Sequence, residues 1–69
     1  MTIKPDVEAI RRLMREKRMS MAELSRLTGI SQLTLDVLMD SDFFALSYLY
    51  LNLIAAALQV EPEEIWKEE

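Results

Sequence analysis

Three acidic residues, Asp36, Asp40 and Asp42, are the nearest thing in this chain to a cation-binding cluster. A calcium-binding loop needs a glycine turn and a distal glutamate, and this segment contains neither. Helix capping and solubility therefore explain these carboxylates better than a metal site does. The chain also lacks histidine and cysteine, which supply most general bases, thiol nucleophiles and zinc ligands. We therefore expect no metal, no cofactor and no enzymatic activity.

Cations that could bind phosphate are confined to one part of the chain. All eight Lys and Arg residues except Lys67 precede Leu27. The net charge of −4 and the pI of about 4.7 are unlike the basic balance of most DNA-binding domains. The basic run from Arg11 to Arg18 could contact nucleic acid, but a solvated helix face explains it without such a role.

Length and composition indicate one small helical domain over residues 1–69. The chain is 51% hydrophobic and has one glycine, which is typical of a compact fold and not of a disordered segment. No N-terminal apolar run indicates a signal peptide. The apolar stretch 43–58 is shorter than the roughly 20 residues that span a bilayer. With no cysteine to form disulfides, we expect a cytoplasmic protein.

Apolar periodicity predicts five helices and no strands. Apolar residues recur on one helical face over residues 7–14, and Pro5 suits the first turn of this helix. Pro62 suits the start of a short closing helix in the same way, with Ile65 and Trp66 as candidates to close the core. The predicted helices cover residues 5–17, 21–27, 32–39, 44–58 and 62–67.

A cap, a glycine turn and a second cap separate the second and third predicted helices. Ser20 and Glu23 have the spacing of a capping box. Gly29 can adopt the positive φ that a tight turn needs, and Ser31 is suited to cap the next helix. The inward-facing residues of these two helices are predicted to be Leu24, Leu27, Leu35 and Leu38.

The order of these residues resembles a known DNA-binding motif. The residues that carry the resemblance are Ser20, Leu24, Gly29, Ile30, Ser31, Thr34, Leu35 and Leu38. Their arrangement is similar to the helix-turn-helix of the lambda-repressor/Cro family, also called the xenobiotic-response-element family. The likeness covers about residues 8–66 and implies a compact, five-helix, all-α, repressor-like domain.

The resemblance also implies which residues would face DNA, because the family places the third helix in the major groove. The matching positions are Met21, Gln32, Leu33, Thr34, Asp36 and Val37. Gln32 and Thr34 have suitable chemistry, since a glutamine can pair with an adenine edge. Leu33 and Val37 cannot donate hydrogen bonds, and Asp36 would repel phosphate.

The predicted 44–58 helix carries a second apolar stripe. By the family register, its core face is Tyr48, Leu51, Ile54, Ala55 and Leu58. The opposite face holds Leu46, Leu49, Tyr50 and Leu53, at spacings of i, i+3, i+4 and i+7. An apolar surface of this extent on a small domain usually marks an interface. The residues that could extend it are Phe43, Phe44, Leu33, Val37 and Met39. Which phenylalanine and which tyrosine lie in the core is left open.

We therefore predict a protein-binding module built on a helix-turn-helix scaffold, with this apolar surface as its interface. Its partner would be another protein or a second copy, with DNA a poor partner and no role for a membrane. The alternative is a dimeric, DNA-binding transcriptional regulator in which the apolar stripe joins the two copies. Two explanations are open for the apolar stretch 32–57: a natural dimeric regulator or antitoxin relative, and deliberate engineering of a new binding surface.

Overall fold

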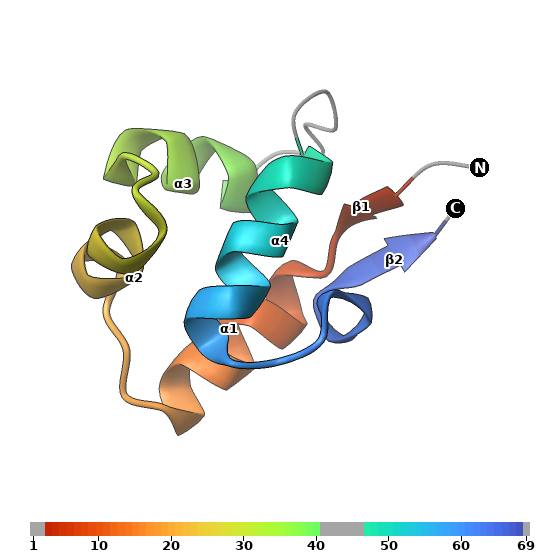
Figure 1. Cartoon of the computed structure of the whole chain (residues 1–69), viewed down its shortest axis with the longest axis horizontal. Helices are drawn as coiled ribbons and strands as arrows, with labels where there is room; N and C mark the ends of the chain where they lie inside the picture. The colour runs from red at the N-terminus through yellow and green to blue at the C-terminus, as the bar shows by residue number, and fades with distance from the viewer. Residues whose placement is uncertain (1–2, 41–46, 69) are drawn as a thin grey trace.

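The computed structural model describes residues 3–40 and 47–68, which form an all-α domain with two short strands added at its ends (Figure 1). In chain order the elements are β1 (Ile3–Pro5), α1 (Val7–Glu16), α2 (Met21–Thr28), α3 (Gln32–Asp40), α4 (Ser47–Leu58), the 3-10 turn η1 (Pro62–Glu64) and β2 (Trp66–Glu68). Within these residues there are four α-helices, so the predicted count of five is not confirmed. None of the described helices has the length and apolar character that crossing a bilayer requires.

Helix α1 begins later than its sequence predicts. The Asp6 carboxylate accepts a hydrogen bond from the backbone N–H of Ala9 at 3.2 Å and so caps the helix. Pro5 lies in strand β1 and not in the first helical turn. At the other end, Arg18 adopts a left-handed φ of 54°, and the Met19 N–H donates to the Met14 carbonyl at 2.9 Å. This pattern closes the helix as a Schellman motif does.

The predicted cap–turn–cap sequence between α2 and α3 is confirmed. The Ser20 Oγ accepts from the Glu23 N–H at 3.1 Å, and Gly29 has a left-handed φ of 78°. Ser31 caps α3, because its Oγ accepts from the Thr34 N–H at 3.1 Å. The Glu23 carboxylate, which the sequence predicts to complete the capping box, lies 3.6 Å from the Arg26 guanidinium.

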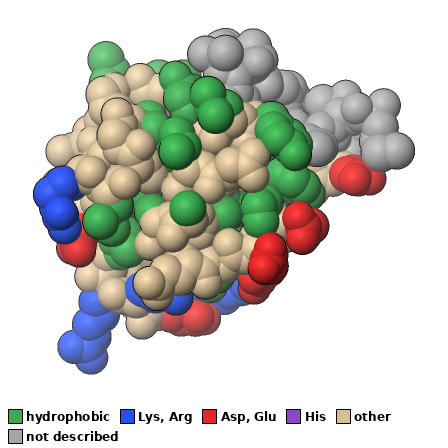
Figure 2. All heavy atoms as spheres, in the orientation of Figure 1, with side chains coloured by type: hydrophobic (Ala, Val, Ile, Leu, Met, Phe, Trp, Pro, Cys, Tyr) green, Lys and Arg blue, Asp and Glu red, His purple; other side chains and the backbone are tan. Residues whose placement is uncertain are grey.

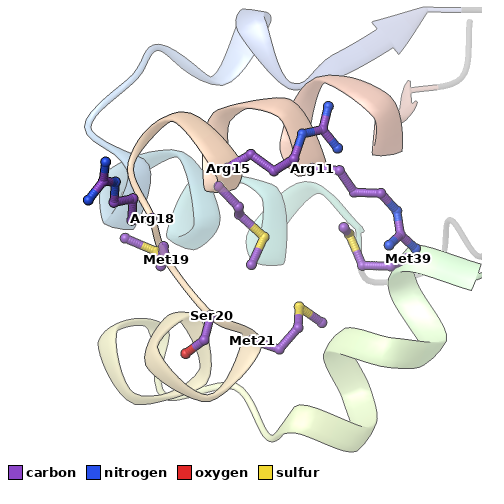
Figure 3. Close-up of a pocket in the computed structure, with 8 residues that line it drawn as sticks. Arg11, Arg15, Arg18, Met19, Ser20, Met21 and Met39 are labelled. Carbon is purple, nitrogen blue, oxygen red and sulfur yellow. The ribbon is translucent and has the colours of Figure 1, made fainter.

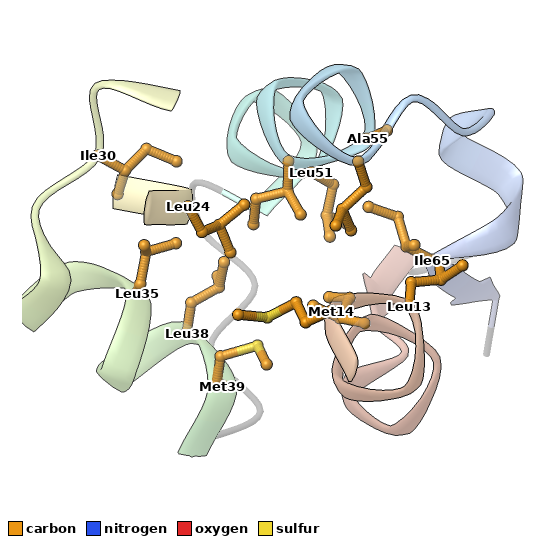
Figure 4. Packing of buried hydrophobic residues seen from close by; sticks show 13 residues of the cluster. Leu13, Met14, Leu24, Ile30, Leu35, Leu38, Met39, Leu51, Ala55 and Ile65 are labelled. Carbon is orange, nitrogen blue, oxygen red and sulfur yellow. The ribbon is translucent and has the colours of Figure 1, made fainter. Parts of the chain in front are cut away.

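The hydrophobic core lies between α1, α4 and the helix-turn-helix pair (Figure 4). Leu24, Leu35, Leu51, Ile54 and Leu58 are fully buried or nearly so, as their spacing predicts. The core is completed by Ile10, Leu13, Met14, Ile30, Leu38, Met39, Ala55 and Ile65. One prediction is wrong: Leu27 is 47% exposed, and it lies near the end of α2 at a surface hollow beside α4.

The C-terminal segment differs most from the prediction of a helix at 62–67. Only Pro62–Glu64 is helical, and it forms a single 3-10 turn. The chain then forms β2, which pairs antiparallel with β1 in the register Pro5 with Trp66. The Asp6 N–H donates to the Ile65 carbonyl at 2.8 Å and ties the start of α1 to this segment. Ile65 is fully buried and closes the core as predicted.

Candidate nucleic-acid interface

The start of α3 presents two polar residues suited to reading bases. Gln32 is the first residue of the helix and is exposed. Thr34 is partly buried, and its Oγ1 accepts a hydrogen bond from the Ser31 hydroxyl at 2.8 Å. The Thr34 hydroxyl is therefore held in place by the cap, and its own proton is left to donate. Of these two residues, Gln32 takes no part in the cap, so its side chain can extend towards a base edge without breaking a capping hydrogen bond.

The outer face of α3 is apolar and acidic. Leu33 is 75% exposed and Val37 is 48% exposed, with an exposed Asp36 between them. α3 contains no Lys or Arg. Met39, which the sequence predicts to extend an outer interface, is 6% exposed and belongs to the core. That prediction is wrong because Met39 shares the inner face with Leu35, four residues earlier.

Helix α1 supplies the cations that α3 lacks. Arg11, Arg15 and Arg18 line a hollow of about 460 Å³ together with Ser20 and Met21 at the start of α2. Methionines line the rest of the hollow, namely Met14, Met19 and Met39. Figure 3 shows Arg11 extending from α1 towards Met39 at the end of α3. The only basic face near the helix-turn-helix in the described chain is thus on α1, next to the N-terminus of α2.

The three arginines around this hollow differ from Arg12 and Arg26 in their ion pairing. Arg12 pairs with Glu16 at 3.8 Å, and Arg26 pairs with Glu23 at 3.6 Å. Within residues 3–40 and 47–68, no carboxylate forms an ion pair with Arg11, Arg15 or Arg18. Their guanidinium groups are therefore available to an anion. The spacing of residues 11 and 15 places both arginines on one face of α1, and Arg18 follows just after the end of the helix.

The outer face of α4 is apolar, as predicted, and the question that the sequence left open about the two tyrosines is answered against the family register. Leu49 is 63% exposed and Leu53 is 37% exposed. Tyr50, predicted to face outward, is partly buried against the core. Tyr48, predicted to be in the core, is 58% exposed and stacks on Trp66 with ring centroids 5.3 Å apart. Tyr48 lies in the first turn of α4, and the ring that it contacts within the described residues is that of Trp66 in β2.

The apolar surface of α4 continues onto α2. Leu27 and Leu53 line a shallow hollow of about 540 Å³ with Met19, Ala56 and Ala57, and Lys17 and Gln59 complete its lining. Figure 2 shows apolar side chains gathered on the face on which α4 lies in Figure 1. We call Leu27, Leu49, Leu53 and Ala56 the α4 face. Leu46, Phe43 and Phe44, which the sequence assigns to the same interface, lie outside the described residues.

No metal site is apparent in the described part of the chain, where no three acidic residues group closely enough to hold an ion. Asp36 and Asp40 are both exposed on α3, and Asp42 lies outside the described residues.

Comparison with known families supports the helix-turn-helix interpretation. A model of the Cro/C1-type helix-turn-helix DNA-binding domain matches residues 9–67. Comparisons with curated proteins and with solved structures gave no match. The family match favours the regulator alternative over the protein-binding module, and it does not support the expectation that DNA is a poor partner. It does not distinguish the two explanations for the apolar stretch.

Proposed function

Because the chain belongs to the Cro/C1-type helix-turn-helix DNA-binding family, we propose that it binds duplex DNA with α3 in the major groove. The observation that carries the proposal is the intact cap–turn–cap geometry of Ser20, Gly29 and Ser31. This geometry exposes the start of α3 in the way that groove reading requires. Gln32 is the residue best suited to contact a base edge, since a glutamine can pair with adenine.

Phosphate contacts in this proposal come from α1 and α2. Backbone phosphates are held by cations and by helix N-termini. Arg11, Arg15 and Arg18 line the same hollow as Ser20 and Met21, which begin α2. A phosphate at the α2 N-terminus would thus have unpaired guanidinium groups beside it. α3 would contribute apolar contacts from Leu33 and Val37, which suit thymine methyl groups.

The DNA proposal is tested by titrating labelled duplex with the protein and following fluorescence anisotropy, first at a low salt concentration of about 20 mM. We expect binding that weakens steeply as the salt concentration rises, because cations displace counterions from the phosphates. The variant Gln32→Ala should lose preference between sequences while retaining non-specific binding. If the protein binds no duplex at low salt, the DNA proposal fails.

The α4 face supports a second proposal, that the chain associates through this surface. α4 has no charged residue between Ser47 and Leu58, although Leu49 and Leu53 are exposed. An uncharged apolar face can pack against its own copy in an isologous dimer. Two copies would then present two α3 helices to successive half-sites. The same face would serve a different protein if the chain is a protein-binding module.

Sedimentation equilibrium distinguishes these possibilities. We expect a dimer for the unmodified chain and a folded monomer for Leu53→Asp, because a buried unpaired carboxylate is costly at an apolar interface. Leu33→Asp is the matched control, since Leu33 is an exposed leucine on α3 and lies outside the α4 face. A monomer at all concentrations would exclude the dimer and leave the α4 face for a foreign partner. A dimer that Leu53→Asp leaves intact would exclude this face.

A further inference from the structure

Methionines are concentrated around the hollow between α1, α2 and α3. Four of the five in the chain line it: Met14, Met19, Met21 and Met39. Met14 and Met39 are buried, whereas Met19 and Met21 are partly exposed. Thioether side chains are flexible and polarisable, so a surface made of them adapts to apolar groups of different shape. The hollow therefore has a soft apolar floor.

The rim of this hollow is cationic and unpaired. Arg11, Arg15 and Arg18 form no ion pair with any described carboxylate, while Arg12 on the same helix pairs with Glu16. A guanidinium group binds carboxylate or phosphate oxygens through two parallel hydrogen bonds. Figure 3 shows the three guanidinium groups at separate places around the hollow, with that of Arg11 directed towards Met39. An anionic group would therefore meet one guanidinium at a time, with its apolar body on the methionines.

The backbone at Arg18 is a separate observation. Its φ of 54° lies in the left-handed region, at the position after α1 where glycine is most common. A glycine there would avoid the steric strain that a side chain incurs. Gln59 has the same backbone conformation after α4, so the strain alone assigns no role to Arg18, but it makes Arg18→Gly a variant that removes the side chain without disturbing the helix end.

We propose that this hollow binds a small organic anion with an apolar body, such as an aliphatic carboxylate or phosphate monoester. The anionic group lies on the arginines, and the hydrocarbon lies on the methionines. The volume of about 460 Å³ falls in the range of small-molecule sites. The proposal goes beyond DNA binding, because a phosphodiester supplies the anion but no hydrocarbon for the methionine floor. A bound ligand would contact the first turn of α2 and the last turn of α3. It would compete with DNA phosphates for the three arginines.

The test is a titration of protein labelled with 13C in its methionine and leucine methyl groups, followed by NMR. The probes are octanoate, inorganic phosphate and octanol, compared at equal ionic strength. We expect octanoate to shift the methyl signals of Met14, Met19, Met21 and Met39 saturably. Phosphate and octanol should each bind at least about tenfold more weakly, since each lacks one half of the ligand.

Variants locate the site. Arg15→Gln should weaken octanoate binding about tenfold, which is the effect of losing one charge-assisted hydrogen bond. Arg18→Gly should weaken it while the fold is retained or stabilised, which a merely structural role would not produce. Arg12→Gln is the matched control and should leave binding unchanged, because Arg12 is paired with Glu16 and does not line the hollow.

Three outcomes would overturn the proposal. Phosphate binding as tight as octanoate would make the hollow a plain anion site. Octanoate shifts at Leu27 and Leu53, with the signals of Met14, Met21 and Met39 unmoved, would show partition onto the α4 face, because Met19 lines both hollows. Equal loss of affinity in Arg12→Gln and Arg15→Gln would mean that only net charge matters. Since all measurements are made without DNA, their failure would not affect the DNA proposal.

Discussion

Helices α1 and α4 bury the same kind of face in the same core, yet their outer faces are opposite in chemistry. Ile10 on α1 and Ile54 on α4 are both fully buried. The outer side of α1 carries Arg11, Arg12, Arg15 and Glu16, whereas α4 has no charged residue and exposes Leu49 and Leu53. The inner faces are therefore set by the shared fold. The outer faces differ in what they could bind, since the α1 face suits anions and the α4 face suits an apolar surface.

The two helices also end in the same way. The Met19 N–H reaches the Met14 carbonyl at 2.9 Å, and the Val60 N–H reaches the Ala55 carbonyl at 3.0 Å. The residue at the left-handed position is Arg18 after α1 and Gln59 after α4, with φ of 54° and 61°. Both ends carry strain that glycine would relieve. Only the one at Arg18 lines the methionine hollow.

The largest expected effects test whether the inner faces are equivalent. Ile10→Ala and Ile54→Ala should each lower the free energy of unfolding by about 2–5 kcal/mol, because each removes a fully buried side chain and leaves a cavity. Urea denaturation at fixed protein concentration measures both. A loss of less than about 1 kcal/mol in either variant would show that its helix does not depend on the shared core.

A smaller effect tests how α1 begins. Asp6→Ala should lower the free energy of unfolding by about 1 kcal/mol, because it removes the cap on the Ala9 N–H. Glu8→Ala is the control, since Glu8 is an exposed first-turn acid and surface changes of this kind usually stay within about 0.5 kcal/mol. Equal losses in the two variants would show that first-turn charge matters and the cap does not.

The smallest effects test the shared helix endings. Arg18→Gly and Gln59→Gly should each raise the free energy of unfolding by up to about 1 kcal/mol, because relief of left-handed strain outweighs the added freedom of the unfolded chain. Thermal or urea unfolding gives both values. Destabilisation by Arg18→Gly alone would mean that its side chain supports the fold.

Local signals in the sequence were sufficient for the helix-turn-helix. Ser20, Gly29 and Ser31 act within a few residues of themselves, so their roles can be inferred without tertiary structure. The buried face of α4 was also predicted, since Leu51, Ile54 and Leu58 keep helical spacing.

Features that depend on distant pairing could not be predicted. Strands of three residues, such as Trp66–Glu68, are too short to show alternation, and β1 and β2 lie at opposite ends of the chain. The family register puts Tyr48 on the core face, and its stacking on Trp66 could not be foreseen, because Trp66 is 18 residues away and α4 begins only at Ser47. The methionine hollow arises only when α1, α2 and α3 pack together.

The central claim is our proposal that Arg11 and Arg15 on α1, with Arg18 just after it, supply the cations that bind DNA phosphates. The most direct test is the salt dependence of duplex binding, measured for the unmodified chain and for the triple variant Arg11→Gln/Arg15→Gln/Arg18→Gln. Each lost phosphate contact should reduce the slope of log affinity against log salt by about 0.9. A slope reduced by about 2 to 3, with lower affinity at all salt concentrations, is the predicted result. An unchanged slope would show that the phosphates are held elsewhere and would contradict the account.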